Sequence, residues 1–176
     1  RRVLFRSGAG VYVYVRDTGV LAPHTELAGR VAPGWTAIAD GYGTSDCHGH
    51  GTHVSGIAAG TSYGVAPKAT IVPVRAFDCT GSASWSNVIA GLDYIASDTT
   101  RRPAVVNLSL GGGANATVDD AVNRAIASGV QVVVAAGNAN ADACLYSPAR
   151  VPAALTVGAT TNLDARASYS KDRKST

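Results

Sequence analysis

A carboxylate, an imidazole and a carboxamide occur in that order along the chain. Each lies in a glycine-containing segment beside an apolar run: Asp17-Thr18-Gly19, His50-Gly51-Thr52-His53 and Ala136-Gly137-Asn138. An imidazole can take a proton from a nucleophile, and a carboxylate can hold that imidazole in the required tautomer. A carboxamide N–H can stabilise the oxyanion that forms when an amide carbonyl is attacked. We therefore predict that Asp17, His50 and Asn138 supply the acid, the base and the oxyanion donor of a nucleophilic hydrolysis.

Each of these residue types also has an ordinary structural role in turns, caps or cores. The segment from Asp46 to His53 concentrates three histidines, a cysteine and an aspartate, which is dense enough for a metal site. Its spacing matches no familiar zinc motif, so metal binding is the less favoured alternative and we predict no metal ligand. A nucleotide-binding glycine loop is less favoured still, because no Gly-x-Gly-x-x-Gly follows a strand.

The elements that must position these side chains alternate along the chain. The run Val11–Val15 is β-branched and aromatic without alternation, which is typical of a parallel strand buried on both faces. Further strands are predicted at Ile71–Val74, Ala104–Leu108, Val130–Ala135 and Ala154–Val157, and helices at His50–Ala59, Ser86–Ser97 and Thr117–Ser128. This alternation predicts an α/β fold with a three-layer, doubly wound and mostly parallel sheet. Sites in such sheets form beyond the carboxyl ends of the strands, where Asp17 and Asn138 fall.

Length and composition set further bounds. The chain of 176 residues is long enough for one domain with a core, and only 15% of its residues are charged. No apolar run is long enough to span a bilayer, so we predict no membrane contact. Basic residues gather at the two ends rather than in a stripe on a structured face, so we predict no nucleic-acid partner. The longest irregular stretch, Leu21–Cys47, is predicted to form surface connections.

Longer stretches around these residues resemble the subtilases, and among them the proteinase K and aqualysin branch. The resemblance is carried by Val13–Gly19, Asp46–Gly56, Asn107–Gly112, Val132–Asn138, Tyr146–Ala149, Thr156–Ala159 and Asp164–Ser170. It implies a secreted, extracellular serine endopeptidase with an Asp/His/Ser triad and no cofactor for catalysis. Asp17 and His50, rather than His53, take the places of the triad acid and base, and Asn138 matches the oxyanion-hole donor.

The resemblance also implies how a polypeptide substrate binds, as an extended strand between two segments of the enzyme. These segments match Ser109-Leu110-Gly111 and Gly81-Ser82-Ala83-Ser84-Trp85. Ala135, Ala136 and Gly137 would wall the main specificity pocket. Because these walls are small, we expect the pocket to take a large apolar or aromatic side chain.

The same resemblance implies disulfides, a structural metal ion and binding partners. Cys47 and Cys79 match a disulfide of the family, and Cys144 matches half of a second one. Structural calcium is implied for the intact enzyme, with carbonyls at Pro152 and Ala154 matching part of one site, and no complete site is predicted in this chain. The expected partners are a polypeptide substrate and the pro-segment of the precursor, and the expected state is a monomer.

The two ends of the chain depart from the family pattern. We therefore divide the sequence into an atypical tail at 1–7, a partial peptidase domain at 8–170 and an atypical tail at 171–176. The Gly-Thr-Ser segment that carries the family's nucleophile is not recognisable, and Ser109, Ser168 and Ser170 are poor substitutes. We expect a fragment without the nucleophilic serine and without the C-terminal part of the fold, inactive alone. A non-catalytic, peptide-binding subtilase is the alternative function.

Arg16 stands where the family has an apolar residue, directly before Asp17. Successive side chains of a strand point to opposite faces of the sheet. If Asp17 faces the site, the Arg16 guanidinium is therefore expected on the opposite, buried face. An unpaired charge there would cost several kcal/mol.

Overall fold

The computed structural model describes residues 7–172, so most of both predicted tails lies outside the described part of the chain. All the strands and helices predicted above occur, with ends that differ by at most two residues. The main strands and helices are β1 (Tyr12–Asp17), α1 (His50–Ala59), β3 (Thr70–Arg75), α2 (Trp85–Ser97), β4 (Ala104–Leu108), α3 (Ala116–Ala127), β6 (Gln131–Ala135) and β8 (Leu155–Val157). The short elements are β2 (Trp35–Thr36), β5 (Gly112–Gly113), a 3-10 turn at Ala143–Leu145 and β7 (Tyr146–Ser147).

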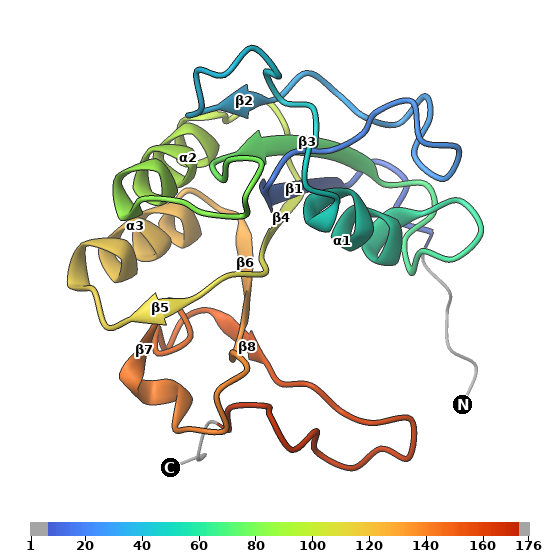
Figure 1. Cartoon of the computed structure of the whole chain (residues 1–176). Helices are drawn as coiled ribbons and strands as arrows, with labels where there is room; N and C mark the ends of the chain where they lie inside the picture. The colour runs from blue at the N-terminus through green and yellow to red at the C-terminus, as the bar shows by residue number, and fades with distance from the viewer. Residues whose placement is uncertain (1–6, 173–176) are drawn as a thin grey trace.

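Six strands form one sheet in the order β2-β3-β1-β4-β6-β8, and every neighbouring pair is parallel. Strands β5 and β7 form a separate antiparallel pair (Figure 1). On one side of β1 the strands β4, β6 and β8 follow in chain order, and on the other side lies β3, with the earlier strand β2 at the edge. The predicted doubly wound, parallel α/β sheet is confirmed, and its crevice is expected beside the carboxyl end of β1.

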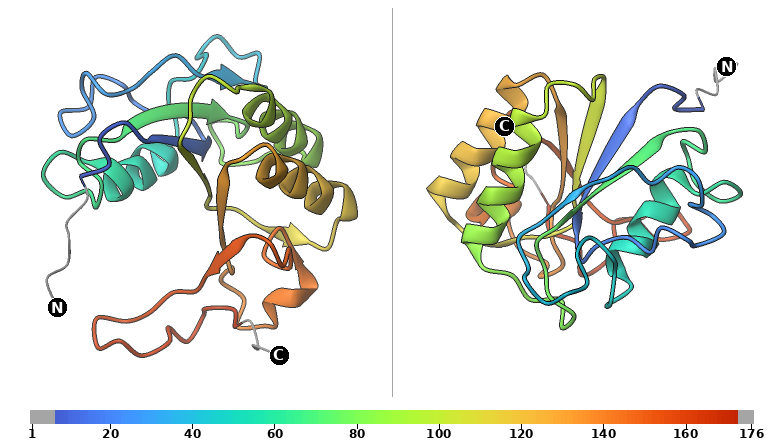
Figure 2. Two further views of the ribbon diagram at one scale, coloured as in Figure 1. Left: turned by 180° about the vertical axis from the view of Figure 1, so that it is seen from behind. Right: turned by 90° about the horizontal axis from the view of Figure 1, so that it is seen from above.

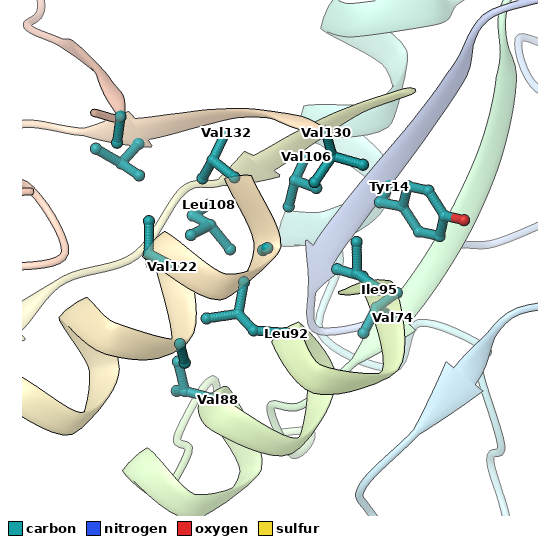
Figure 3. Packing of buried hydrophobic residues seen from close by; sticks show 14 of the residues in the cluster. Tyr14, Val74, Val88, Leu92, Ile95, Val106, Leu108, Val122, Val130 and Val132 are labelled. Atoms are coloured by element: carbon teal, nitrogen blue, oxygen red, sulfur yellow. The ribbon is translucent and has the colours of Figure 1, made fainter. Parts of the chain in front are cut away.

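Helices cover both faces of the sheet, which makes three layers (Figure 2). Helices α2 and α3 lie on one face and α1 on the other. Tyr14 belongs to the core beneath α2 and α3, whereas Val13 and Val15 belong to the core beneath α1. Strand β1 is therefore buried on both faces, as its uniformly apolar run predicts. Figure 3 shows the larger core, in which valine and leucine side chains from the sheet and from both helices interdigitate.

Two helices begin at side-chain caps. The Ser84 side chain accepts a hydrogen bond from the backbone N–H of Asn87 at the start of α2. The Asn115 side chain accepts a hydrogen bond from the backbone N–H of Val118 at the start of α3. Each cap satisfies a backbone donor that the helix itself leaves unpaired. None of the helices within residues 7–172 has the length and apolar character needed to cross a membrane.

The Arg16 side chain is fully buried on the α2 face of β1, as predicted. Its Nε donates a hydrogen bond to the Val88 carbonyl at 3.2 Å, and its guanidinium lies 5.5 Å from the centre of the Phe77 ring. Among residues 7–172, neither Nη1 nor Nη2 has a hydrogen-bond partner. Desolvation lowers the pKa of Arg16 to about 9, although the nearby Asp17 carboxylate opposes this shift.

One expectation about the connections needs correction. The stretch Leu21–Cys47 was predicted to be irregular, yet it contains β2, which pairs with Val74 and Arg75 at the edge of the sheet. A strand of two residues has no periodicity of its own. Its conformation depends on a partner strand that lies far away in the sequence, so local patterns do not reveal it.

Candidate active site

Asp17 and His50 lie in direct contact at the carboxyl end of the sheet. Asp17 ends β1 and points to the α1 face, while His50 is the first residue of α1. His50 Nδ1 lies 2.7 Å from Asp17 Oδ1, and the same oxygen accepts a hydrogen bond from the backbone N–H of Thr18 at 2.8 Å. The Asp17 side chain is 2% exposed and the His50 side chain 44% exposed. The carboxylate is thus fixed inside the protein, and the imidazole it orients remains open to a ligand.

A glycine allows α1 to begin so close to β1. A Cβ atom added at Gly51 would lie 2.1 Å from the Gly19 carbonyl oxygen, so no side chain fits there. The backbone N–H of Gly51 donates a hydrogen bond to Thr18 Oγ1 at 3.0 Å. The glycine after His50 therefore serves the close approach of two backbones.

The Asp46 carboxylate stabilises the turn before His50 through several hydrogen bonds. Its Oδ1 accepts hydrogen bonds from Thr18 Oγ1 and from the backbone N–H groups of His48 and Gly49. Its Oδ2 accepts two from Thr52, through the backbone N–H and Oγ1. Burial alone would raise the pKa of Asp46, but these hydrogen bonds outweigh burial and lower the pKa to about 2.

This bracing role of Asp46 was missed in the sequence, where the residue was considered only as a metal ligand. The usable signal was its position four residues before His50, in a turn that contains Gly49. An ionised carboxylate can accept several backbone hydrogen bonds in such a turn.

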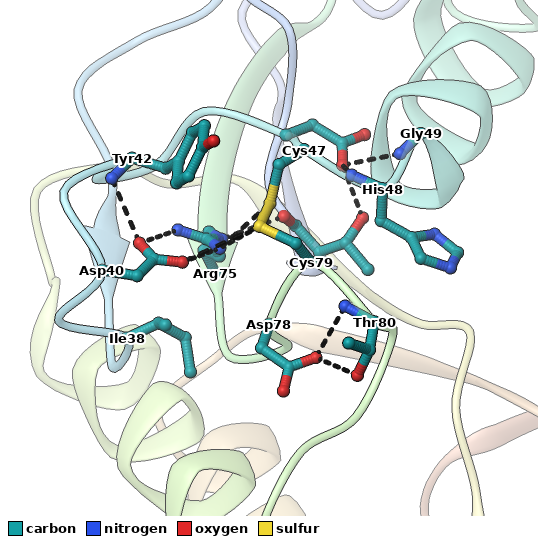
Figure 4. Close-up of a disulfide and its surroundings, with 12 residues drawn as sticks. Ile38, Asp40, Tyr42, Cys47, His48, Gly49, Arg75, Asp78, Cys79 and Thr80 are labelled. Carbon is teal, nitrogen blue, oxygen red and sulfur yellow. Dashed lines mark hydrogen bonds and ion pairs between the residues drawn. A yellow bond between two sulfur atoms is a disulfide. The ribbon is translucent and has the colours of Figure 1, made fainter.

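A disulfide joins this turn to the loop after β3 (Figure 4). Cys47 and Cys79 are bonded, which confirms the predicted pair. Beside the disulfide, the buried Arg75 guanidinium forms a bidentate pair with Asp40, through bonds of 2.8 and 2.6 Å. This pair lowers the pKa of Asp40 to about 2. Arg75 Nη2 also lies 3.3 Å from Cys47 Sγ, so the disulfide and the ion pair support one another.

The ligand atoms of the histidine-rich segment do not converge with one another within residues 7–172. Within residues 7–172, the ligand atoms that converge as a metal site would require belong to Asp40, Cys47 and Cys79. Both of these sulfurs are oxidised in the disulfide, so they are not thiolate ligands. His48 and His50 instead meet edge to face, with ring centroids 6.4 Å apart. This geometry disfavours the zinc alternative.

A cleft of about 350 Å³ opens in front of the Asp17–His50 pair. Both predicted substrate segments reach it. One contributes Ser109, Leu110 and Gly111, and the other contributes Gly81, Ala83 and Trp85. Ser82 and Ser84 belong to the same loop but do not line the cleft; Ser84 caps α2 instead.

A second cavity, of about 190 Å³, adjoins the first across Ser109-Leu110-Gly111, which lines both. Its other walls include the predicted pocket residues Ala135, Ala136 and Gly137, together with Asn138. Asn138 therefore lines this adjoining cavity and does not line the cleft in front of His50. Gly137 has a φ of 102°, a conformation that favours glycine and turns the chain so that Asn138 follows at the rim.

Ser109 and Ser170 make other contacts than a nucleophile would. Ser109 Oγ accepts a hydrogen bond from Asn107 Nδ2 at 2.8 Å. Ser170 is buried, and its Oγ bonds to the backbone of Ala159 and Lys171. Within residues 7–172, the hydrogen bonds of the His50 ring and backbone involve no serine hydroxyl.

Comparison with known proteins shows strong similarity along nearly the whole chain. The family model described as "Subtilase family" matches residues 8–176. An extracellular serine proteinase of Thermus sp. (strain Rt41A) is 58% identical over 164 residues, which cover 93% of this chain and 40% of that protein. Alkaline serine exoprotease A of Vibrio alginolyticus is 51% identical over 163 residues, which cover 93% of this chain and 30% of that protein.

A solved structure agrees with these sequence matches. A cold-adapted subtilisin-like serine proteinase superposes with a TM-score of 0.91 at 49% identity, over 94% of this chain and 60% of that one. The chain therefore spans less than half the length of these two curated relatives and 60% of the solved chain. The family match and the shared fold together establish that this chain belongs to the subtilase family.

Proposed function

We propose that this chain provides the acid, the base and the oxyanion donor of a serine endopeptidase. The observation that carries the proposal is the 2.7 Å contact between the buried Asp17 carboxylate and His50 Nδ1 at the mouth of a cleft. With Nδ1 bonded to Asp17, His50 Nε2 is the nitrogen left to accept a proton from a nucleophilic hydroxyl. Asp17 holds the tautomer and stabilises the imidazolium that forms.

Asn138 is proposed to donate an N–H to the oxyanion of the tetrahedral intermediate. Its position in the adjoining cavity would place the scissile carbonyl between the two compartments, next to Ser109-Leu110-Gly111. A peptide running along this segment could add as a strand, with backbone hydrogen bonds giving affinity and the cavities giving specificity. In subtilisin, itself a member of this family, removing an asparagine donor of the oxyanion hole lowers kcat by about 10²–10³, and we expect a loss of that order here.

The nucleophile is proposed to come from outside this 176-residue chain, because His50 makes no hydrogen bond to a serine hydroxyl within residues 7–172. By this proposal the 176-residue chain alone binds peptides but does not hydrolyse them. A fluorophosphonate probe that labels a serine of the purified chain, located by mass spectrometry, would contradict this part of the proposal.

Secretion and the remaining partners are proposals of the same kind. The Thermus relative is named as extracellular, and the Cys47–Cys79 disulfide suits an oxidising compartment. We propose a secreted monomer that acts on polypeptides and is made with a pro-segment, without nucleic-acid or membrane partners. Calcium would be structural in the whole protein. The carbonyls of Pro152 and Ala154 are two neutral donors, which by themselves do not fit a site of six to eight oxygens with carboxylates.

A chimera tests the catalytic proposal. This chain replaces the matching 164-residue stretch of the Thermus proteinase, to which it is 58% identical. We expect the chimera to hydrolyse peptides, and Asp17→Asn to lower kcat by about 10⁴ because the imidazole takes the wrong tautomer. His50→Ala should lower kcat by about 10⁶, since residues that act as a unit lose nearly the whole rate when one is removed.

The matched control is His53→Ala, which removes the other histidine of the same helix turn. It should leave kcat within a few-fold of the parent chimera. Equal losses from His50→Ala and His53→Ala would contradict the assignment, as would retention of full activity without Asp17. Circular dichroism on each variant separates loss of chemistry from loss of fold.

The second candidate function is a subtilase that holds peptides without cutting them. It is favoured by the cleft of about 350 Å³ that lacks a serine bonded to His50 within residues 7–172. It predicts the same peptide binding by the purified chain but no hydrolysis by the chimera.

A further inference from the structure

A lysine lines the cavity that the sequence predicted to take a large apolar or aromatic side chain. Small walls at Ala135, Ala136 and Gly137 suggested a pocket for a large apolar side chain. The structure adds further walls, from residues that the sequence did not connect with this pocket: Tyr146, Ser147, Ala149 and Lys171. At about 190 Å³ the cavity is below the range of about 300–1,000 Å³ typical for drug-sized ligands, and suits a single side chain.

The Lys171 side chain is held against two of these walls. The residue is 8% exposed, and its backbone N–H donates a hydrogen bond to the Gly137 carbonyl at 2.8 Å. Its Nζ lies 2.8 Å from the centre of the Tyr146 ring. A Cβ atom added at Gly137 would lie 3.1 Å from Nζ, so the ammonium is placed beside the residue that precedes Asn138.

This ammonium has no carboxylate partner within the described part of the chain. The ion pairs within residues 7–172 join other groups: Asp17 with His50, Asp40 with Arg75, Asp93 with Arg124, Asp98 with Arg101 and Asp119 with Arg150. Desolvation lowers the pKa of Lys171, as expected for an ammonium that burial separates from water without a compensating anion. A buried, unpaired charge favours a ligand that neutralises it.

We propose that Lys171 is a specificity-determining residue, whose ammonium binds the side-chain carboxylate of a glutamate or aspartate in a peptide lying along Ser109-Leu110-Gly111. The proposal rests on the proposed function, because it requires a peptide to bind as a strand in this cleft. It replaces the expected preference for a large apolar side chain. Lys171 lines the cavity beside Gly137 and Tyr146, and an ammonium in such a wall can form a charge-assisted hydrogen bond with a carboxylate.

Peptide binding by the purified chain tests the proposal without catalysis. The probes are four-residue peptides, acetylated and amidated, with three alanines followed by glutamate, glutamine or leucine. Isothermal titration calorimetry gives their dissociation constants. We expect the glutamate peptide to bind about tenfold more tightly than the glutamine peptide, as a charge-assisted hydrogen bond would give. A leucine peptide with a free C-terminal carboxylate distinguishes a chain end from an acidic side chain as the source of the anion.

Three variants make the result specific to this residue. Lys171→Met removes the charge at similar length and should bring the glutamate and glutamine affinities within about twofold of each other. Lys171→Arg should keep the preference. The matched control is Lys68→Met, a lysine just before β3 at the opposite end of the sheet, which should leave the preference unchanged.

The outcomes separate this inference from the proposed function. Binding of all peptides with equal affinity, a preference retained in Lys171→Met, or tightest binding of the leucine free acid would overturn the role of Lys171 alone. Failure of every peptide to bind the folded chain would overturn the proposed strand-binding cleft and the inference with it. The comparison of glutamate with glutamine on the unaltered chain needs no variant, so a variant that fails to fold does not decide the matter.

Discussion

Replacing Arg16 by isoleucine should stabilise the chain. The guanidinium is fully buried between β1 and α2, and only its Nε has a hydrogen-bond partner within residues 7–172. Replacing buried charged groups by well-packed apolar side chains can raise the free energy of unfolding by up to about 4 kcal/mol. Loss of the Nε hydrogen bond and loss of the contact with Phe77 each reduce this gain in stability by about 1 kcal/mol. We therefore expect the free energy of unfolding to rise by about 2 kcal/mol.

The assay is urea unfolding of the purified chain followed by circular dichroism, with a thermal scan beside it. A gain of about 2 kcal/mol corresponds to a rise in Tm of about 4–8 °C for a chain of this size. The control is Arg124→Met, which removes a half-exposed pair with Asp93 and should change stability by less than about 1 kcal/mol. No gain from Arg16→Ile, or a loss, would refute the conclusion that this charge is uncompensated.

The gain should also depend on pH, with a sign that follows from the pKa of Arg16. Burial lowers that pKa from the usual range of arginine to about 9, so between pH 9 and that usual range the unfolded chain binds more protons than the folded chain. Stability of the parent chain therefore rises with pH in this range, and the penalty is fully present below pH 9. The difference in free energy of unfolding between Arg16→Ile and the parent chain should be constant below pH 9 and should become smaller above it.

Three further changes probe the structure around the candidate active site. Asp46→Asn should lower the free energy of unfolding by about 1–2 kcal/mol at pH 7. Because the folded-state pKa of Asp46 is about 2, this difference from the parent chain should vanish as the pH falls from about 4 to 2. Acid unfolding curves of both chains check this. Reduction of the Cys47–Cys79 disulfide, which spans 32 residues, should lower stability by about 3–4 kcal/mol in urea unfolding. Gly51→Ala should lower kcat of the chimera by about 10², because the added Cβ collides with the Gly19 carbonyl and displaces α1 from β1. Unchanged stability in the first two cases, or unchanged kcat in the third, would refute the corresponding role.

The fold was predictable from local patterns because its strands and helices have strong ones. The β-branched and aromatic run of β1, for example, is visible within a short window of the sequence. Strand β2 was not predictable, because two residues acquire their extended form only by pairing with β3. Pairing depends on a partner that lies far away in the sequence, and propensity does not contain that information.

The site was predictable only in part. The order of the three residues, with Asp17 and Asn138 beyond strand ends and His50 at a helix start, predicted that they converge on one edge of the sheet. The structure brings Asp17 and His50 into contact. The Asp46 brace and the buried Lys171 were not predicted. Both depend on distances between segments remote in sequence, and residue 171 was assigned to an atypical tail although its side chain packs into the cavity beside Gly137.

The tautomer of His50 in the purified chain tests the central claim most directly. Nitrogen-15 spectra of histidine-labelled protein at alkaline pH report which ring nitrogen carries the proton. Contact with the Asp17 carboxylate predicts a single His50 form with the proton on Nδ1, lost in Asp17→Ala and unaffected by His53→Ala. A His50 proton on Nε2, or a spectrum that Asp17→Ala leaves unchanged, would show that carboxylate and imidazole do not act together.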